Sequence, residues 1–366
     1  MNLQLLYQWI KTVGRHFPTL KKWQATGLAI FSYGIVVAEA CQVSKVAEGL
    51  ALLGKIPSVE RRLRRWLDKD EIEIGGCWES WVKWVWSACE LPRAILLVDE
   101  TKLGERIGVM MVSLAYGGRA IPLVWRCYWA NDAEAYPSQG QVLLIWGLLA
   151  RVVEWLPPRA RPLVEMDRGL GHSSAMLRAL QTLPLHYLVR VKATARFTSS
   201  RGHGSLLSDL IKPGESLACS GTLFTRQRTV SVQLRLVWEI AQAEPWCLVT
   251  NDPSLRAAGY AVRMWQEESF RDLKSGGWQW QRSLVRLPRR AERLVLALAL
   301  AYAWMLSQGT LLAYAEPALQ REVCADRFNK YSLFRSGLRF FKRFVQVDVS
   351  KLYLGLFFAP LFKPCP

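Results

Sequence analysis

The order of apolar runs between residues 94 and 192 constrains the fold of this chain most. Runs with the composition of strands alternate with stretches of helical spacing, which predicts a mixed α/β sheet with helices packed on its faces. Gly117 and Gly118 separate the second and third runs and signal a hairpin turn. The expected elements, in chain order, are strands at 94–99, 107–116 and 120–129, a helix at 139–156, a strand at 162–167, a helix at 173–182 and a strand at 187–192.

Two of these strands end on an acidic residue, Asp99 and Asp167, and a third acid, Glu267, lies on a later stretch of helical spacing. Carboxylates from strand ends and a helix can converge on divalent cations, and Mg²⁺ binds few carboxylates together with substrate phosphates. Two such ions about 4 Å apart activate an attacking oxygen and stabilise a leaving one. A single aspartate at a strand end is more often a turn or cap residue. The combination of the three acids therefore carries the prediction of a phosphodiester-cleaving site.

The run from Tyr260 to Lys274 places four polar side chains on one stripe of a predicted helix. It reads Y-x2-R-x3-E-x6-K, and at about 100° per residue Arg263, Glu267 and Lys274 fall within about 60° of Tyr260. A stripe with one acid among cations suits a site that holds a metal ion beside a phosphate. The alternative interpretation is a solvated, charged helix face.

The chain of 366 residues carries a formal net charge of +18, and 51% of its residues are hydrophobic. The hydrophobic fraction predicts a globular protein, and the positive charge predicts a polyanionic partner, with nucleic acid favoured over a membrane surface. The eight cysteines include no C-x2-C pair, which argues against a structural zinc site and for reduced thiols in a cytoplasmic protein. The apolar run 294–306 is shorter than the roughly 20 residues of a membrane span, so a buried core helix is expected there.

The N-terminal region looks helical. Two expected helices, at 44–53 and 59–69, are separated by a break at Gly54-Lys-Ile-Pro57, which is the outline of a helix-turn-helix. The second helix carries candidates for DNA contact, with a solvated basic face as the alternative: Arg61, Arg62 and Arg65. The expected regions of the chain are a helical DNA-binding region at 1–90, the first part of the core at 91–192, a β-rich insertion at 193–252, the second part of the core at 253–310 and a basic C-terminal tail at 311–366.

Four segments together resemble a DDE transposase, and the resemblance is strongest to the bacterial insertion-sequence-four family with its Y-R-E-K signature. The segments are Val98-Asp99-Glu-Thr101, Met166-Asp167-Arg168-Gly169, Trp246-Cys-Leu-Val-Thr250-Asn251 and the run from Tyr260 to Lys274. The order of the expected elements is also that of the ribonuclease-H-like fold. The resemblance implies an α/β protein with a ribonuclease-H-like mixed sheet flanked by helices, a β-rich insertion before the last catalytic acid and a helical N-terminal DNA-binding region.

By this resemblance, Asp99, Asp167 and Glu267 are expected to bind two Mg²⁺ (or Mn²⁺) ions and to cleave DNA at the ends of an insertion sequence. The freed 3′-hydroxyl would attack target DNA in a cut-and-paste reaction, either directly or after a hairpin stage. A homodimer is expected, because pairing two element ends requires two active sites, and the expected location is the bacterial cytoplasm. The alternatives are a catalytically inactive DNA-binding relative and a ribonuclease-H-type nuclease without strand transfer.

Further side chains are expected to contact DNA. Tyr260, Arg263 and Lys274 would hold phosphates near the cut, as a hydroxyl donor, a planar fork and a point charge. Trp238 and Trp246 are candidates for stacking a flipped base, with ordinary core packing as the alternative for both. The remaining candidates for phosphate contact, with a surface ion pair or a place at the sheet edge as the alternative, are Arg168, Arg190 and Lys192.

Overall fold

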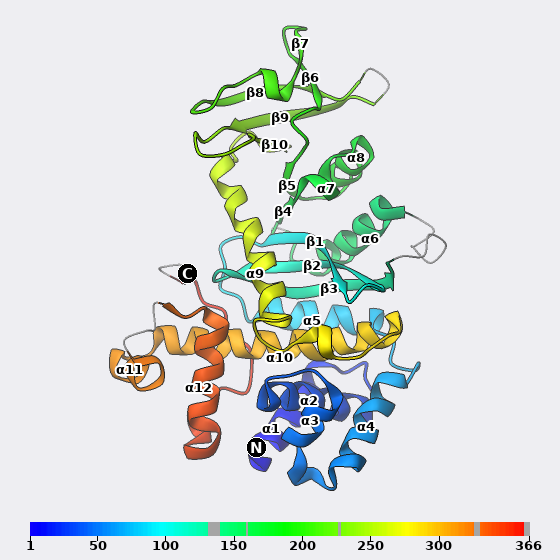
Figure 1. The fold of residues 1–366 in the computed structure, drawn as a ribbon, viewed down its shortest axis with the longest axis vertical. Helices are drawn as coiled ribbons and strands as arrows, with labels where there is room; N and C mark the ends of the chain where they lie inside the picture. The colour runs from blue at the N-terminus through cyan, green and yellow to red at the C-terminus, as the bar shows by residue number, and fades with distance from the viewer. Residues whose placement is uncertain (131–139, 159, 226–227, 326–329, 362–366) are drawn as a thin grey trace.

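Ten strands form one mixed sheet that runs through the molecule (Figure 1). The structure is a computed structural model, and it describes residues 1–130, 140–158, 160–225, 228–325 and 330–361. The strands are β1 (Ile95–Leu103), β2 (Ile107–Tyr116), β3 (Arg119–Trp129), β4 (Leu163–Met166), β5 (His186–Arg190), β6 (Arg196–Ser199), β7 (Gly204–Leu206), β8 (Ser216–Leu223), β9 (Val230–Val237) and β10 (Trp246–Thr250). Their order across the sheet is β3-β2-β1-β4-β5-β10-β9-β8-β6-β7.

The strands β1 to β5 form the mixed α/β core that the sequence predicts. β1 pairs antiparallel with β2 and parallel with β4, and β5 continues the sheet parallel to β4. The predicted fold class is confirmed. One boundary differs, because β1 does not end at Asp99 but continues to Leu103. It can continue because β2 still pairs with it, up to Leu103 opposite Ile107, after β4 has ended.

The β-rich region expected at 193–252 extends this sheet rather than forming a separate one. β10 pairs antiparallel with β5 on one side and with β9 on the other, and β8 and β6 follow. In Figure 1 these strands lie at the end of the molecule opposite the N-terminal helices. The insertion is therefore joined to the core by backbone hydrogen bonds along β5.

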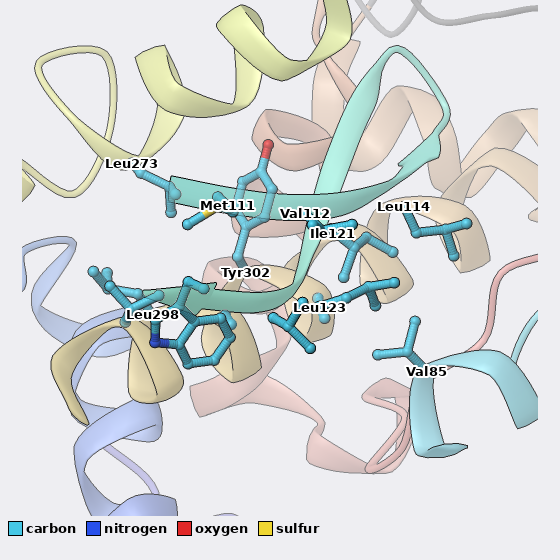
Figure 2. Close-up of a cluster of buried hydrophobic side chains, with 14 of the residues drawn as sticks. Val85, Met111, Val112, Leu114, Ile121, Leu123, Leu273, Leu298 and Tyr302 are labelled. Atoms are coloured by element: carbon cyan, nitrogen blue, oxygen red, sulfur yellow. The ribbon is translucent and has the colours of Figure 1, made fainter. Parts of the chain in front are cut away.

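Helices enclose the core around β1, β2 and β3. α5 (Gly75–Ser87) and α10 (Pro288–Tyr314) pack against β3, and α9 (Met264–Leu273) contacts β1, β2 and β3. Figure 2 shows this core, with Val85 of α5 beside Leu114 and Leu123 of the sheet. The helices expected between the later strands are confirmed as α6 (Gly140–Trp155) and α8 (Ser174–Gln181), although Gln139, the expected first residue of the former, lies outside the described residues.

The apolar run 294–306 lies inside α10, a helix of 27 residues. Among the described residues, α10 is the one helix that by itself is long and apolar enough to cross a membrane. The helices α2 (Lys22–Ala38) and α3 (Val43–Gly49) reach that length and hydropathy only when taken together, and they are bent by 85° relative to each other. In α10, however, 94% of the most apolar window is buried inside the molecule. The prediction of a buried core helix is confirmed.

The N-terminal region is helical, as expected. Its first four helices, α1 (Leu3–His16), α2, α3 and α4 (Ile56–Asp68), lie below α10 in Figure 1, whereas α5 packs on the core. The break between the two expected helices is present, because α3 ends at Gly49 and α4 begins at Ile56. Pro57 lies in the first turn of α4, where a missing N–H costs little because that group has no partner within the helix.

The C-terminal region, expected as a basic tail, is folded against the core. α11 (Pro317–Cys324) and α12 (Leu333–Val347) both pack against α10. α12 is strongly amphipathic, and its phenylalanines lie in the core while its cations face outward. Two of these cations are paired with acids, Lys342 with Glu39 and Arg343 with Glu322. The apolar face of α12 is what attaches this region to the rest of the fold.

Candidate active site

The parallel pairing of β1 with β4 brings the first two acids to the same edge of the site. Val98 lies opposite Met166 at the end of this pairing, and the next residue in each segment is Asp99 or Asp167. Adjacent parallel strands point in the same direction, so residues that follow the same register position lie side by side. The expected convergence of these two acids is therefore a consequence of strand order and register.

Asp167 has a structural role as well. Its Oδ1 accepts a hydrogen bond of 3.0 Å from the backbone N–H of Leu170 and so caps α7 (Arg168–Gly171). Its Oδ2 lies 3.9 Å from Nη2 of Arg263. The cap thus uses one carboxylate oxygen and holds the other toward the site.

The guanidinium of Arg263 contacts all three acids. Its Nη2 lies 3.1 Å from Oδ2 of Asp99, in addition to its contact with Asp167, and its Nη1 donates a hydrogen bond to Oε1 of Glu267. The Arg263 side chain is only 12% exposed, so these interactions are screened less than those of a surface pair. The structure therefore gathers Asp99, Asp167 and Glu267 around one cation.

The charges in this cluster are not balanced. Burial raises the pKa of Asp99 to about 6, although the positive charge of Arg263 acts in the opposite direction. Burial alone would lower the pKa of Arg263, but Asp99 and Glu267 raise it above its ordinary value. Three carboxyl groups face one guanidinium, so the cluster has the capacity to bind further positive charge.

The helix expected to carry the Y-R-E-K run is two elements, and this corrects the prediction of one continuous stripe. A 3₁₀ helix, η3 (Ala257–Arg263), is followed by α9. Tyr260 is buried, and its hydroxyl donates a hydrogen bond of 3.1 Å to the backbone carbonyl of Met166. Tyr260 therefore belongs to the 3₁₀ helix before α9, and its buried hydroxyl is bound to β4 rather than free to contact a phosphate.

Lys274 lies at the C-terminal end of α9 and reaches back to β1. Its ammonium donates a hydrogen bond to the hydroxyl of Thr101. Burial lowers the pKa of Lys274, while the nearby charge of Asp99 opposes that change. Thr101 is not among the predicted site residues. Its position could have indicated it, because Thr101 follows Asp99 by two residues on β1, and residues two apart on a strand point to the same face.

The donor atoms of the cluster fit a divalent cation by type and by charge. Carboxylate oxygens are the ligands that Mg²⁺ and Mn²⁺ prefer, and Mg²⁺ commonly takes one or two of them beside waters and substrate phosphates. Within the described ranges, no group of three Asp, Glu, His or Cys side chains is spaced to hold a single ion. The acids instead surround Arg263, so their arrangement suits ions shared with a substrate better than a closed protein cage.

Glu244 links two of the arginines expected to contact DNA. Its Oε1 accepts a hydrogen bond of 2.5 Å from Arg168 and another of 2.9 Å from Arg190. Glu244 lies in the connection between β9 and β10, and nothing in the surrounding sequence marks it as a site residue. Lys192, the third expected phosphate contact of this group, is exposed just after β5.

The two tryptophans named as stacking candidates have different surroundings. Trp246 packs edge-to-face on Tyr260, with ring centroids 5.4 Å apart. Trp238 lies just after β9 and donates its indole N–H to the carbonyl of Gln242 at 2.9 Å. Both are partly exposed, and the contact with Tyr260 gives Trp246 a packing role beside the candidate site.

The basic residues expected to contact DNA from α4 are exposed. Arg64 pairs with Glu60 on the same helix, whereas the other three have no acidic partner within the part of the chain that the structure describes. These three unpaired arginines are Arg61, Arg62 and Arg65.

Comparison with known proteins identifies a matching family model. Residues 147–304 match the model described as a transposase DDE domain. This stretch contains Asp167 and Glu267 and begins after Asp99. No curated protein matches the chain. Among solved structures, a crystal structure of human ENDOV matches at 12% sequence identity with a TM-score of 0.25. The match covers 56% of this chain and 82% of that chain.

Proposed function

We propose that the chain is a transposase with a DDE domain, the family whose model matches residues 147–304, and that it cleaves DNA at the ends of an insertion sequence with Asp99, Asp167 and Glu267. The proposal includes transfer of the freed 3′-hydroxyl ends into target DNA. The observation that carries it is the convergence of the three acids on Arg263. Membership of the insertion-sequence-four group is part of the proposal and is supported by the Y-R-E-K run.

The three carboxylates are the proposed holders of two Mg²⁺ (or Mn²⁺) ions. When bound, these ions would supply Lewis-acid activation of the attacking oxygen and stabilisation of the leaving oxygen. The buried, partly neutralised carboxyl of Asp99 and the more exposed carboxylates of Asp167 and Glu267 would give up their contacts with Arg263 when such cations bind.

The cations around the acids are proposed to hold the DNA. Arg263 has a planar fork that matches two phosphate oxygens, and Lys274 supplies a point charge from the end of α9. Tyr260 is better suited to positioning than to phosphate contact, because its hydroxyl is already bound to the carbonyl that precedes Asp167. In this role Tyr260 fixes the backbone from which Asp167 projects.

The partner is DNA, and the proposed assembly is a homodimer that pairs two element ends in the bacterial cytoplasm. The excess of positive charge and the unpaired arginines of α4 support binding to the terminal repeats. A dimer provides one active site for each of the two ends.

The test is cleavage of a labelled element end by the purified protein with Mg²⁺. Asp99→Asn, Asp167→Asn and Glu267→Gln are each expected to reduce cutting by at least about 100-fold, as for the loss of a principal charge-stabilising group. Asn at position 167 can still cap α7, which separates the loss of charge from the loss of the cap.

Glu268→Gln is the matched control, because Glu268 is adjacent on α9 but pairs with Arg271 and Arg119 outside the cluster. Undiminished cutting by any of the three acid variants would remove that residue from the proposed site. Joined products distinguish transposition from hydrolysis, and cutting without joining would favour a nuclease.

A further inference from the structure

A groove between α2 and α4 combines aromatic and cationic side chains far along the chain from the three acids. It has a volume of about 570 Å³, within the range of pockets that hold small organic groups. Its lining includes no acidic residue. Trp23 and Lys22 line it from α2, and Trp66, Arg62 and Arg65 line it from α4.

The floor of the groove is rigid. The indole of Trp66 lies against Gly27, where an added Cβ would come within 2.2 Å of the ring, and its N–H donates a hydrogen bond of 3.0 Å to the carbonyl of Gln24. Gly27 is therefore required for the close approach of α2 and α4. Ile30 and Leu63 add to the apolar surface of this floor.

The rim of the groove is basic and unpaired. Arg62 and Arg65 lie three residues apart on α4, Lys69 follows as the residue that ends the helix, and Lys22 lines the groove from the start of α2. All four side chains are exposed, and none has an acidic partner within the described part of the chain. Four cations without an acidic partner create a positive potential that favours an anionic occupant.

Trp23 is the second feature of the groove that indicates what binds there. Its indole is 43% exposed at the edge of the groove, although it is large and apolar. An exposed indole beside cations is the combination that binds an unpaired nucleotide, because the base stacks on the ring while the phosphates contact Arg and Lys. A regular duplex would use the cations but would leave the indole without a partner.

We propose that this groove binds an unpaired nucleotide of the DNA substrate, with its base on Trp23 and its phosphates on Arg62, Arg65, Lys69 and Lys22. The inference rests on the proposed function for the identity of the polymer as DNA. It adds a single-strand binding site on the N-terminal helices, separate from the acids and from the insertion.

The test measures binding by fluorescence anisotropy in EDTA, so that no cutting takes place. Three labelled probes are compared: a blunt duplex, the same duplex with a short 3′ overhang, and that overhang with abasic residues. Trp23→Ala is expected to weaken binding of the base-bearing overhang by about five- to 100-fold and to leave the other two probes unchanged. Trp23→Phe should retain most of the affinity, because a phenyl ring can still stack.

Trp146→Ala is the control, since Trp146 is also exposed, at 37%, but lies on α6. Arg65→Gln should weaken binding of all three probes and reduce their salt dependence. Equal binding of the overhang by wild type and Trp23→Ala, with circular dichroism showing both folded, would overturn the groove proposal. Failure of the wild type to bind any probe would instead contradict the proposed function.

Discussion

At the scale of single residues, the arginines expected to contact DNA from the core, unlike those of α4, are already held by carboxylates. Arg263 contacts Asp99, Asp167 and Glu267, and Arg168 and Arg190 share Glu244. Such contacts keep long side chains in place and so reduce the conformational entropy lost when they bind a phosphate. They also place a negative charge where the phosphate is expected.

Removal of the charge of Glu244 should therefore strengthen DNA binding. In Glu244→Gln the two guanidinium groups lose their shared anion, and the repulsion between that anion and DNA phosphates is lost too. Because Glu244 is partly exposed, the effect is expected to be about 1 kcal/mol, or roughly fivefold in affinity. The measurement is the dissociation constant for duplex DNA at several salt concentrations.

The matched control is Glu239→Gln, since Glu239 is exposed in the same connection between β9 and β10. It should change affinity less than Glu244→Gln. Weaker binding by the Glu244 variant would show that the carboxylate supports the arginines more than it competes with DNA.

At the scale of elements, close backbone contacts decide how helices pack. α10 and α12 approach each other at Gly337, where an added Cβ would lie 1.8 Å from the carbonyl oxygen of Met305 and 2.9 Å from the backbone nitrogen of Gly309. These neighbours are backbone atoms inside helices, so they cannot move aside as a flexible side chain would. Gly337 thus permits the packing of the C-terminal region on the core.

Gly337→Ala is expected to destabilise the protein by about 1–3 kcal/mol or more, because it overpacks this contact. Gly14→Ala serves as the control, since a Cβ at Gly14 in α1 meets nothing within 4 Å and should stabilise the fold by about 0.4–1 kcal/mol. Urea unfolding of both variants measures the difference. Equal stability of Gly337→Ala and wild type would mean that α12 can shift along α10 at little cost.

At the scale of the whole molecule, the sheet buries acidic groups whose ionisation affects stability. Glu165 is fully buried on β4, and burial raises its pKa to about 8, although the nearby backbone and charge of Arg263 act in the opposite direction. The folded chain therefore keeps a proton that the unfolded chain releases near pH 4.5. This contribution to stability is complete below that pH and is lost as pH rises through about 8.

Glu165→Gln should remove this pH dependence, because an amide is neutral at every pH in that range. Relative to the variant, wild type is expected to lose about 1.4 kcal/mol of unfolding free energy for each pH unit between the two pKa values. Denaturant unfolding at pH 6 and at pH 9 measures it, with other titrating groups common to both proteins. Parallel stability curves would show that Glu165 is ionised in the folded state or finds another stabilising partner.

The sequence by itself determined the order of elements and led to the proposal of the three acids. Continuous apolar runs mark β1 to β5 because each strand must bury at least one face, and that requirement is local. Asp99, Asp167 and Glu267 could be named because carboxylates next to buried strands and on a charged helical stripe are uncommon in combination. The sequence of α12 also has an amphipathic pattern, but the positive charge of this region led to the prediction of a basic tail.

Only the tertiary structure decided which of these residues meet. The parallel register of β1 and β4 places Asp99 beside Asp167, and that register depends on which strands become neighbours. The buried position of Tyr260 includes a hydrogen bond to Met166, a contact across 94 residues. Glu244 reaches Arg168 and Arg190 from another strand connection for the same reason. Local periodicity reports which face of an element is buried, whereas contacts between distant segments arise only when the sheet is assembled.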